Sequence, residues 1–435
     1  MSFRTLLQRL ITAVSPGVVL LTIMLSPVWA NPAGGDGGAD YETGKVIVKL
    51  DPAAGATISA INATYGTTSV AVLPHSGDIY LLQLPPGTTV DEIVQVMEND
   101  RRLAYAEPNF IAEAPEANPR DTHAWGGHDS APFFGQYAVE VLSLTTAHDI
   151  SRGAGAVVAV LDTGVQLDHL ALTTSLAVTR YDFVDDDPVP EDEPNGLDDD
   201  GDSLVDEAAG HGTHVAGIIH LVAPEAQIMP LRVLDSDGRG NMFTLAEALL
   251  YAGHNGAGVI NLSLGTPARS KLLRDTIREL THSGVVVVAA AGNLSADVEQ
   301  YPAADQCALA VTSVGPTGTK STFANFGNWV AVAAPGEAIY STFPIHGYAW
   351  WSGTSMATPF AAGQVALIRS MASSLTVREV AELIGGTAQP LDALNPAFAG
   401  RLGAGRLDIG ASLVHLMAGV WPDAGRGILS NSCSE

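Results

Sequence analysis

The strongest constraint on the fold is a set of short, β-branched apolar segments that alternate with helical patterns. The apolar segments lie at 156–161, 227–233, 258–264, 284–291, 308–314 and 328–335. The helical patterns lie at 212–220, 243–254, 268–282 and 356–372. Continuous apolar strands separated by helices predict an α/β fold, in which a mainly parallel central sheet is covered on both faces to give three layers. In such folds ligands bind beyond the carboxyl ends of the strands.

A smaller pattern precedes this one. Residues 45–50 alternate like a strand, 76–84 resemble a second strand, and 88–100 open with helix start signals and continue at helical spacing. We therefore predict a small α+β domain of roughly 70 residues, just large enough to form its own core. A Pro- and Ala-rich linker and a turn-rich stretch to about Gln136 should follow it.

The first 30 residues have the organisation of a secretory signal peptide. Arg4 and Arg9 precede an apolar run over 10–25, and Val28 and Ala30 occupy the minus-three and minus-one places of a cleavage site after Ala30. An uncleaved membrane anchor is the alternative, but a Pro-Gly pair interrupts the run and it is shorter than the roughly 20 residues that span a bilayer. We expect a secreted protein, extracellular or periplasmic, with no membrane contact once the signal is removed.

The charge of the chain excludes one class of partner. The 47 Asp and Glu residues outnumber the 21 Lys and Arg residues, so the surplus of basic side chains that nucleic-acid binding requires is missing. A hydrophobic fraction of 46% also excludes a disordered acidic chain. Half of the net charge of −26 lies in one segment, 181–207, which has 13 acidic residues and no Lys or Arg. Two cysteines, Cys307 and Cys433, could pair or stay free.

Three short strings carry candidate chemistry, and the first is VVAVLDTGVQLDH. It places Asp162 just past a buried strand. Aspartic proteases use two DTG strings to pair two carboxylates. The chain has no second DTG, so it cannot supply that dyad by itself.

The second string, GHGTHVAGI, opens a helix at His211 and places His214 one turn later. Two histidines at this spacing could bind zinc, but the HExxH spacing, its glutamate and a cysteine cluster are missing. The ordinary alternative is that one histidine caps or packs the start of the helix. Gly210 and Gly212 favour the close approach of another stretch of chain.

The third string, SGTSMATPFAAG, places Ser355 at a Gly-Thr turn, with Pro359 in the first turn of the next helix. Ser355 could be an ordinary N-cap. It could also be a nucleophile, because the amides at a helix start can bind an oxyanion. The string is not the GxSxG elbow of α/β-hydrolases.

In the order Asp162, His211, Ser355, these strings resemble the catalytic domain of the subtilisin-like (subtilase) serine proteases over residues of about 140 to 415. A fourth block, VVVVAAAGN, ends at Asn293, where the family has its oxyanion-hole amide. The resemblance implies a subtilisin-like fold and a triad in which His211 accepts the proton of Ser355 while Asp162 orients the imidazole. Asn293 and the Ser355 amide would stabilise the oxyanion, and catalysis would need no cofactor.

The resemblance also implies substrate contacts. An extended peptide would bind by strand addition between two segments, which are Gly238, Arg239 and Gly240, and Ser263, Leu264 and Gly265. Ala290 and Gly292 would line the pocket for the residue before the cleaved bond. For the glycines, simple turn formation is the alternative. Arg239 suggests tolerance for acidic substrate residues, although an arginine at a surface is more often merely solvated.

The small N-terminal unit resembles subtilase propeptides in KVIVKL, the following helix and YAEPNF. In that family such units assist folding and block the active site until they are removed. An adaptor domain is the alternative. The expected organisation is a signal peptide at 1–30, a propeptide at 31–115, a catalytic domain at 116–420 and a C-terminal tail at 421–435. Cleavage should fall after Glu107 and before about Gln136.

The acidic segment is a candidate metal site. Asp198, Asp200 and Asp202 alternate along the chain, and Asp206 follows four residues later. Alternating carboxylates around a glycine suit Ca²⁺, a hard cation with six to eight oxygen ligands. The segment lacks the glycine and glutamate positions of an EF-hand, and a solvated acidic loop is the alternative.

We expect a monomeric serine endopeptidase that acts on polypeptides, is inhibited by its own propeptide and binds Ca²⁺ only as a structural ion. A catalytically silent subtilase-like binding protein is an alternative, against which the intact triad and Asn293 argue. An esterase or lipase on another hydrolase fold is a second alternative, and the order of the three residues argues against it.

Overall fold

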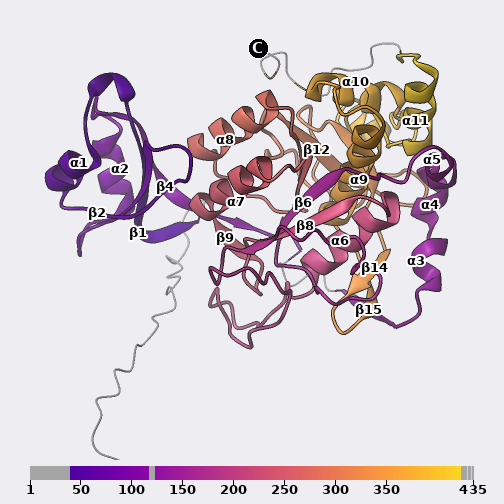
Figure 1. Cartoon of the computed structure of the whole chain (residues 1–435), viewed down its shortest axis with the longest axis horizontal. Helices are drawn as coiled ribbons and strands as arrows, with labels where there is room; N and C mark the ends of the chain where they lie inside the picture. Colours follow the sequence, from indigo (N-terminus) through magenta and orange to yellow (C-terminus); the bar gives the residue numbers. More distant parts are fainter. Residues whose placement is uncertain (1–39, 117–122, 423–428, 430–432, 434–435) are drawn as a thin grey trace, which may run out of the picture.

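The computed structural model describes residues 40–116, 123–422, 429 and 433. The signal peptide predicted at 1–30 lies outside these residues, as does most of the tail at 421–435. A small N-terminal unit stands beside a larger body, and strand β4 runs from one to the other (Figure 1). Within the described ranges, none of the helices combines the length and apolar character that a bilayer-spanning segment requires.

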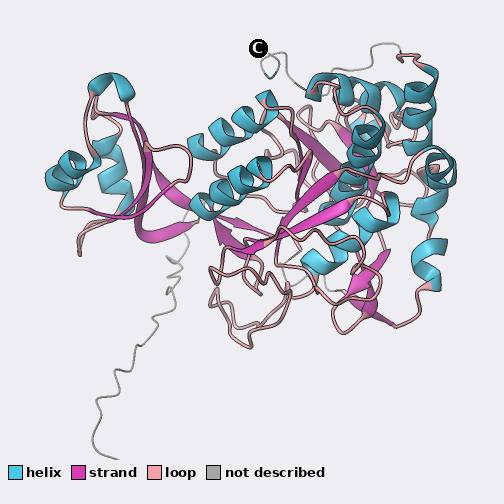
Figure 2. Cartoon of the chain, viewed as in Figure 1, coloured by secondary structure: helices cyan, strands magenta, loops and turns pink. Residues whose placement is uncertain are grey.

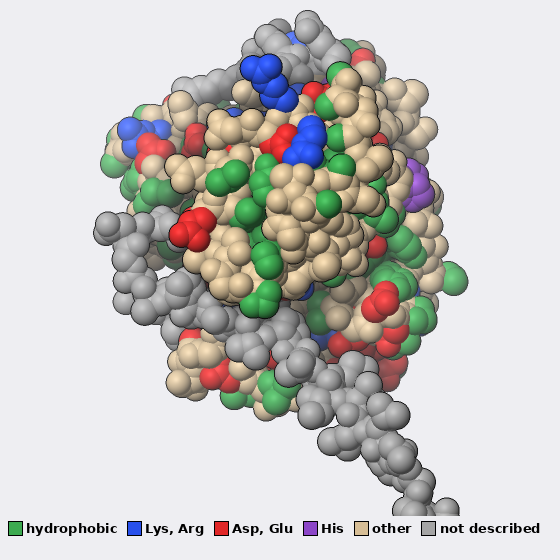
Figure 3. Space-filling model, turned by 90° about the vertical axis from the view of Figure 1, so that its left-hand side faces the viewer, with side chains coloured by type: hydrophobic (Ala, Val, Ile, Leu, Met, Phe, Trp, Pro, Cys, Tyr) green, Lys and Arg blue, Asp and Glu red, His purple; other side chains and the backbone are tan. Residues whose placement is uncertain are grey.

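The N-terminal unit is an antiparallel sheet with two helices, as the α+β pattern predicts. Its elements are β1 (Tyr41–Leu50), a 3₁₀ turn (Pro52–Ala54), α1 (Ile58–Tyr65), β2 (Thr68–Val72), β3 (Ile79–Gln83), α2 (Val90–Met97) and β4 (Leu103–Glu113). Thr57 and Thr89 cap the two helices, each accepting a backbone N–H with its hydroxyl. Val46, Ile61 and Met97 are fully buried between sheet and helices, so the unit has its own core. On the side where this unit lies, basic side chains are scattered singly (Figure 3).

Strand β4 is longer than the sequence pattern indicates. The sequence pattern predicts a linker after the small unit, whereas Leu103–Glu113 forms one continuous strand that pairs with β1 and then with β9 (Arg239–Asn241) of the larger body. Pro108 interrupts the strand pattern in the sequence. Proline has no amide to donate to a sheet, so it is uncommon inside strands. It stands opposite Val46, next to a shift in the register with β1. The small unit's sheet therefore continues into the larger body, in the order β2-β3-β1-β4-β9.

The larger body is built on a parallel sheet of seven strands in the order β13-β12-β11-β10-β6-β8-β7. Six of the strands lie within or overlap the six predicted apolar segments. The strands are β6 (Val157–Asp162), β7 (Tyr181–Asp182), β8 (Gln227–Arg232), β10 (Val259–Leu262), β11 (Val286–Ala290), β12 (Ala308–Val314) and β13 (Val332–Pro335). Almost every residue of β10 to β13 is buried, as a sheet covered on both faces requires.

Helices cover both faces of this sheet, which confirms the three-layer fold (Figures 1 and 2). The four predicted helical patterns correspond to α6 (His211–Val222), α7 (Met242–His254), α8 (Lys271–His282) and α9 (Thr354–Met371). Helices α7 and α8 lie side by side between the sheet and the small unit, and α9 packs on the other face with α6. Helix α8 begins later than its pattern because the Ser270 hydroxyl caps it, accepting the amide of Leu273.

The remaining elements surround this core. They are β5 (Ala124–Gly127), α3 (Ala131–Gly135), α4 (Tyr137–Val141), α5 (Leu144–Ile150), β14 (Ile339–Phe343), β15 (Gly347–Trp351), α10 (Val377–Thr387), a 3₁₀ turn (Pro396–Phe398) and α11 (Ile409–Ala418). Strands β14, β15 and β5 form a small antiparallel sheet. Cys307 and Cys433 form a disulfide, which answers the question of pairing and ties the C-terminal tail to the body beside β12.

Candidate active site

Asp162, His211 and Ser355 meet at the carboxyl edge of the parallel sheet. Asp162 is the last residue of β6, His211 is the first of α6, and Ser355 is the second of α9. The imidazole Nδ1 of His211 lies 2.7 Å from Oδ1 of Asp162, and all three residues are fully buried. Within the described residues, Ser355 Oγ and His211 Nε2 do not share a hydrogen bond. Each instead contacts Oε2 of Glu116.

Glycines allow the start of α6 to approach β6 closely, as the sequence pattern predicts. A Cβ on Gly212 would lie 2.0 Å from the carbonyl oxygen of Gly164, and one on Gly210 would lie 2.5 Å from the ring of Phe343. Gly210 also has a φ of +93°, which L side chains rarely adopt. Gly212 therefore lets the start of α6 approach the end of β6, where His211 contacts Asp162, and Gly210 lets it approach Phe343 of β14.

A buried carboxylate that the sequence analysis missed joins the same two elements. Asp192 Oδ1 accepts Thr163 Oγ1 at 3.0 Å and the amide of Gly210 at 2.9 Å, while its Oδ2 accepts the hydroxyl of Thr213 at 2.6 Å and the amide of Thr213 at 2.9 Å. Burial raises the pKa of Asp192, and the hydrogen bonds from Thr213 and Gly210 oppose that shift. Nothing local distinguishes this residue from the other acidic residues of 181–207.

His214 packs into the interior rather than joining a metal site. Its Nε2 lies 3.1 Å from the carbonyl oxygen of Ala349. Burial lowers the pKa of His214 to about 3, so the ring is neutral at ordinary pH. This geometry favours the packing interpretation over a zinc ligand.

Ser355 is fixed by an interruption in its own helix. The sequence pattern predicts Pro359 in the first turn of the helix, but α9 begins at Thr354, so Pro359 lies in the second turn. Proline has no amide to donate to the carbonyl four residues earlier, which is that of Ser355. Ser263 Oγ donates to this carbonyl instead, at 3.0 Å. Gly353 occupies the N-cap position, so Ser355 is not the cap of its helix.

Asn293 presents an amide donor beside Ser355. It follows the end of β11 by three residues, and its Oδ1 accepts both the amide and the hydroxyl of Thr354, at 3.0 and 2.9 Å. Its Nδ2 is thereby directed at Oε1 of Glu116, 2.8 Å away. The amide of Ser355 donates to the same oxygen at 3.2 Å. Two N–H donors thus converge on one oxygen, which is the geometry of an oxyanion hole.

The residue that occupies this centre is Glu116, which the sequence analysis assigned no role. Its Oε2 accepts the hydroxyl of Ser355 and lies 3.2 Å from His211 Nε2. Glu116 is only 3% exposed. Burial alone would lower the pKa of His211, but the carboxylates of Asp162 and Glu116 outweigh burial and raise it. Glu116 lies in the Pro- and Ala-rich stretch, where no motif distinguishes it.

The end of β4 runs to this centre between the two segments assigned to substrate. Glu113 exchanges two backbone hydrogen bonds with Gly265, each of 2.9 Å, and stands opposite Arg239 in the pairing of β4 with β9. Ala112 stands opposite Gly240, and the amide of Ala114 donates to the carbonyl of Gly238 at 2.9 Å.

The other residues assigned to substrate are buried. Ser263 and Leu264 are fully buried. Ala290 is also buried, at the end of β11. The amide of Gly292 donates to Thr354 Oγ1 at 3.0 Å.

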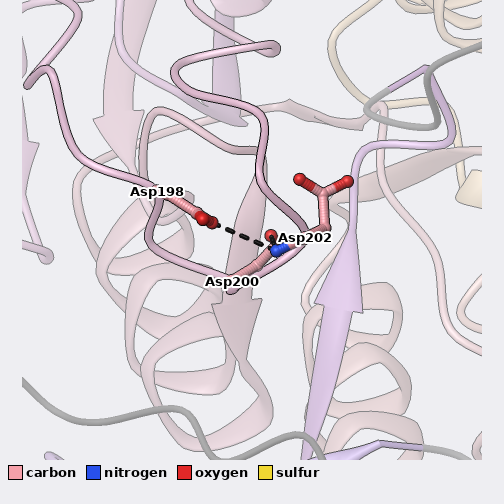
Figure 4. Close-up of side chains that lie close together, drawn as sticks. All are labelled: Asp198, Asp200 and Asp202. Atoms are coloured by element: carbon pink, nitrogen blue, oxygen red, sulfur yellow. Dashed lines mark hydrogen bonds between the residues drawn. The ribbon is translucent and has the colours of Figure 1, made fainter.

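The part of the acidic segment that contains residues 198–206, called the acidic loop below, brings three of its four predicted metal ligands together. Oxygens of Asp198, Asp200 and Asp202 lie within 4.8 Å of one another (Figure 4). Asp206 has a different environment, because its Oδ1 accepts the amide of Asn195 at 2.7 Å.

Two more carboxylates border this loop, and the sequence analysis named neither. Asp237 accepts the amides of Asp199 and Asp206. Burial, followed by the nearby carboxylates Asp237, Asp202 and Asp200, raises the pKa of Glu207 to about 7. The region is thus crowded with carboxylates from two separate segments.

Comparisons with known proteins agree with this geometry. A family model described as "Subtilase family" matches residues 153–405, and one described as "Fervidolysin N-terminal prodomain" matches residues 30–109. The chain is 40% identical to thermitase of Thermoactinomyces vulgaris over 273 residues, which are 59% of this chain and 92% of thermitase. It is 35% identical to a thermophilic serine proteinase of Bacillus sp. (strain AK1) over 314 residues, 68% of this chain and 72% of that protein.

A solved structure shares the fold. Fervidolysin from Fervidobacterium pennivorans, described as a keratinolytic enzyme related to subtilisin, superposes with a TM-score of 0.71 and 23% sequence identity. The match covers 86% of this chain and 61% of that one, so the chain spans less than two thirds of fervidolysin.

Proposed function

Because the chain belongs to the subtilase family and is a serine endopeptidase, we propose that Asp162, His211 and Ser355 are its catalytic triad and that Asn293 completes its oxyanion hole. The observation that carries this assignment is the Glu116 carboxylate. One of its oxygens accepts Asn293 Nδ2 and the Ser355 amide, and the other contacts Ser355 Oγ and His211 Nε2. A carboxylate held in this way imitates the charged oxygen that forms when the serine attacks a peptide bond.

In the proposed reaction, Ser355 Oγ attacks the carbonyl carbon of the substrate while His211 Nε2 removes the hydroxyl proton. The 2.7 Å contact of Asp162 with Nδ1 keeps the Nδ1–H tautomer, which leaves Nε2 free to accept that proton. His211 then gives the proton to the leaving amine, and water hydrolyses the acyl-enzyme in a second round.

The oxyanion that forms in each round would accept the amides of Asn293 and Ser355. Loss of one such donor reduces kcat on the order of 10² to 10³, a range taken from subtilisin, a member of the same family. The reaction as subtilases carry it out requires no cofactor.

We further propose that residues 31–115 are a propeptide that inhibits the enzyme within the same chain and that Glu116 fills the catalytic centre. The groove between Gly238–Gly240 and Gly265 supports this, because β4 already occupies it by strand addition. An incoming peptide would have to displace this strand. The same pairing supports the assignment of the two flanking segments to substrate, with Ala290 and Gly292 beside the residue before the cleaved bond.

The remaining parts of the proposal concern the ends of the chain. Residues 1–30 would direct secretion, residues 116–420 would form the catalytic domain of a monomeric enzyme, and 421–435 would be a tail held by the Cys307–Cys433 disulfide. The N-terminal residue and mass of the secreted protein would test these boundaries. An N-terminus between Glu107 and Gln136 is expected.

We propose that the acidic loop holds a structural Ca²⁺. Three carboxylates whose oxygens lie within 4.8 Å form a set of hard oxygen donors, and a divalent cation would relieve their mutual repulsion. Asp198, Asp200 and Asp202 would be the ligands. Asp206 would shape the loop through its contacts with the amides of Asn195 and Gly196.

The endopeptidase assignment is tested by incubating the processed protein with casein beside a Ser355→Ala variant. The wild-type protein should release peptides, and the variant should release almost none. Phenylmethylsulfonyl fluoride should label Ser355 in the wild-type protein. Equal absence of proteolysis in both, after removal of the propeptide, would instead support a catalytically silent binding protein.

A further inference from the structure

The side chain of Arg239 lies in the groove that β4 fills and faces three carboxylates. Its Nε lies 3.2 Å from Glu113 Oε1, its Nη2 lies 3.3 Å from Asp40 Oδ2, and its Nη1 lies 3.8 Å from Asp200 Oδ2. Arg239 is only 9% exposed, so the alternative that it is merely solvated does not hold while the N-terminal unit is in place. The guanidinium therefore has a specific electrostatic environment.

Two of these three carboxylates belong to the N-terminal unit. Asp40 precedes β1 and Glu113 ends β4, whereas Asp200 lies in the acidic loop of the larger body. Removal of the propeptide would remove Asp40 and Glu113. Of the three carboxylates, Asp200 would remain beside Arg239, and it is the most distant of them. An arginine side chain stays charged throughout the pH range in which proteins are folded. Processing would therefore uncover a cation whose donors face the groove.

Glu113 stands where a substrate residue would stand. It is directly opposite Arg239 in the antiparallel pairing, and opposite residues of such a pair project their side chains to the same face. Any peptide that adds to β9 in this register places one side chain beside Arg239. Glu116, which reaches the nucleophile, follows Glu113 by three residues.

We propose that Arg239 gives the processed enzyme a preference for an acidic side chain at the substrate position that Glu113 fills in the precursor. The inference rests on the proposed function of this site. Asp200 partly neutralises the guanidinium, with Asp198 and Asp202 beside it in the same loop. The side chain of Glu113 is 49% exposed, so solvent screens the pair. We therefore expect a preference of about three- to fivefold in kcat/KM, the size typical of a half-exposed ion pair.

The test uses peptides that differ only in one residue, which is Glu, Gln or Lys, placed two, three or four residues before the cleaved bond in three parallel series. At one of these positions the processed enzyme should cleave in the order Glu, Gln, Lys, with a Glu-to-Gln ratio of about three to five. The ratio should approach one in about 1 M NaCl, because salt screens a partly exposed pair.

Variants then assign the preference to one side chain. Arg239→Gln should bring the Glu-to-Gln ratio close to one, and Arg239→Lys should keep part of it. Arg378→Gln is the matched control, because it removes an exposed arginine that pairs with Glu382 on α10, and it should keep the wild-type ratio.

Two results would overturn the proposal. They are equal cleavage of Glu and Gln peptides by the wild-type enzyme in all three series, and a preference that survives in Arg239→Gln. If Arg239→Gln does not fold, the salt dependence of the wild-type ratio and the Arg239→Lys variant decide. If only this inference is wrong, the enzyme still cleaves the Gln peptides. If the proposed endopeptidase function is wrong, it cleaves none of the peptides.

Discussion

At the scale of single residues, the geometry of the site depends on a carboxylate that does not touch the reacting atoms. Asp192 accepts four hydrogen bonds from groups on either side of Asp162 and His211. We predict that Asp192→Asn lowers kcat about tenfold and reduces the free energy of unfolding by about 2 kcal/mol. An asparagine has one acceptor oxygen, so its amide nitrogen must face two of the donors that the carboxylate now accepts.

Peptidase assays and urea unfolding of the processed enzyme would measure both effects. Glu193→Gln is the matched control, because it neutralises the adjacent exposed carboxylate without touching this network. A variant at Asp192 that behaves like the control would show that the network does not position His211.

The same scale shows what local sequence can reveal. Asp162, His211 and Ser355 each have a local signal, namely a strand end, a pair of glycines or a turn before a helix, so they could be identified one at a time. Asp192 and Glu116 have no such signal. Their roles arise from contacts with residues far along the chain, such as Gly210 and Asn293. Sequence patterns report the elements near a residue and do not report which side chains a fold brings together.

At the scale of elements, continuous apolar runs predicted the parallel strands because burial on both faces leaves no alternation to recognise. The sequence patterns do not predict the antiparallel strands β2, β4, β5, β9, β14 and β15, nor the short parallel strand β7. These strands lack a continuous β-branched apolar run: β14 includes Ser341 and Thr342 although it is almost wholly buried, and β4 includes Pro108. Helix α9 begins two residues before its predicted start, which places Pro359 in the second turn, and the donor that compensates for Pro359, Ser263, lies in the loop after β10.

This arrangement makes a prediction about α9. Ser263→Ala should destabilise the protein by about 1 to 3 kcal/mol, because the buried carbonyl of Ser355 would lose its donor. In a Pro359→Ala background, the new amide at position 359 can bond that carbonyl within the helix. The same Ser263→Ala change should then cost about 1 kcal/mol less. Urea unfolding of the four proteins of this cycle measures the coupling, and strictly additive effects would contradict the assignment of the donor.

The acidic loop makes a second prediction at this scale. A chelator should lower the unfolding midpoint, because a cation bound only to the folded state stabilises it by about 2.7 kcal/mol at 100 times its Kd. Asp202→Asn should reduce the chelator effect, since it removes one of three clustered carboxylates. Asp187→Asn, in the same acidic segment but outside the cluster, is the control. Melting curves with and without chelator are the measurement, and an unchanged wild-type midpoint would count against a structural ion.

At the scale of the whole molecule, the N-terminal unit completes the larger body as well as covering its groove. Glu107 accepts the amides of Lys271 and Leu272 and the hydroxyl of Ser270, so it caps α8 from outside. Asn109 accepts the amide of Phe243 at 3.0 Å, in the first turn of α7. The unit therefore supplies acceptors to both helices on its side of the sheet. Such contacts favour folding of the larger body while the two remain joined.

The last prediction concerns how pH affects the stability of the precursor, in which the N-terminal unit is still joined to the larger body. With Glu116 in place, the pKa of His211 is raised above its ordinary value, chiefly by the carboxylates of Asp162 and Glu116 acting against burial. A histidine whose pKa is raised on folding contributes stability that is complete below the unfolded value of about 6.5 and is lost as pH rises through the folded value. The precursor should therefore become less stable as the pH rises above about 6.5.

Glu116→Gln should weaken this dependence, by about 1.4 kcal/mol for each pKa unit that the Glu116 carboxylate adds. Melting curves between pH 6 and 9 on two precursors, Ser355→Ala with and without Glu116→Gln, would measure it, because Ser355→Ala keeps both chains uncut. Other buried carboxylates with raised pKa values, such as Glu107 and Asp192, affect both proteins equally and cancel in the difference. Identical pH profiles would show that Glu116 does not hold the proton on His211, whereas a flatter profile for Glu116→Gln would show that the Glu116 carboxylate stabilises the protonated imidazole in the precursor.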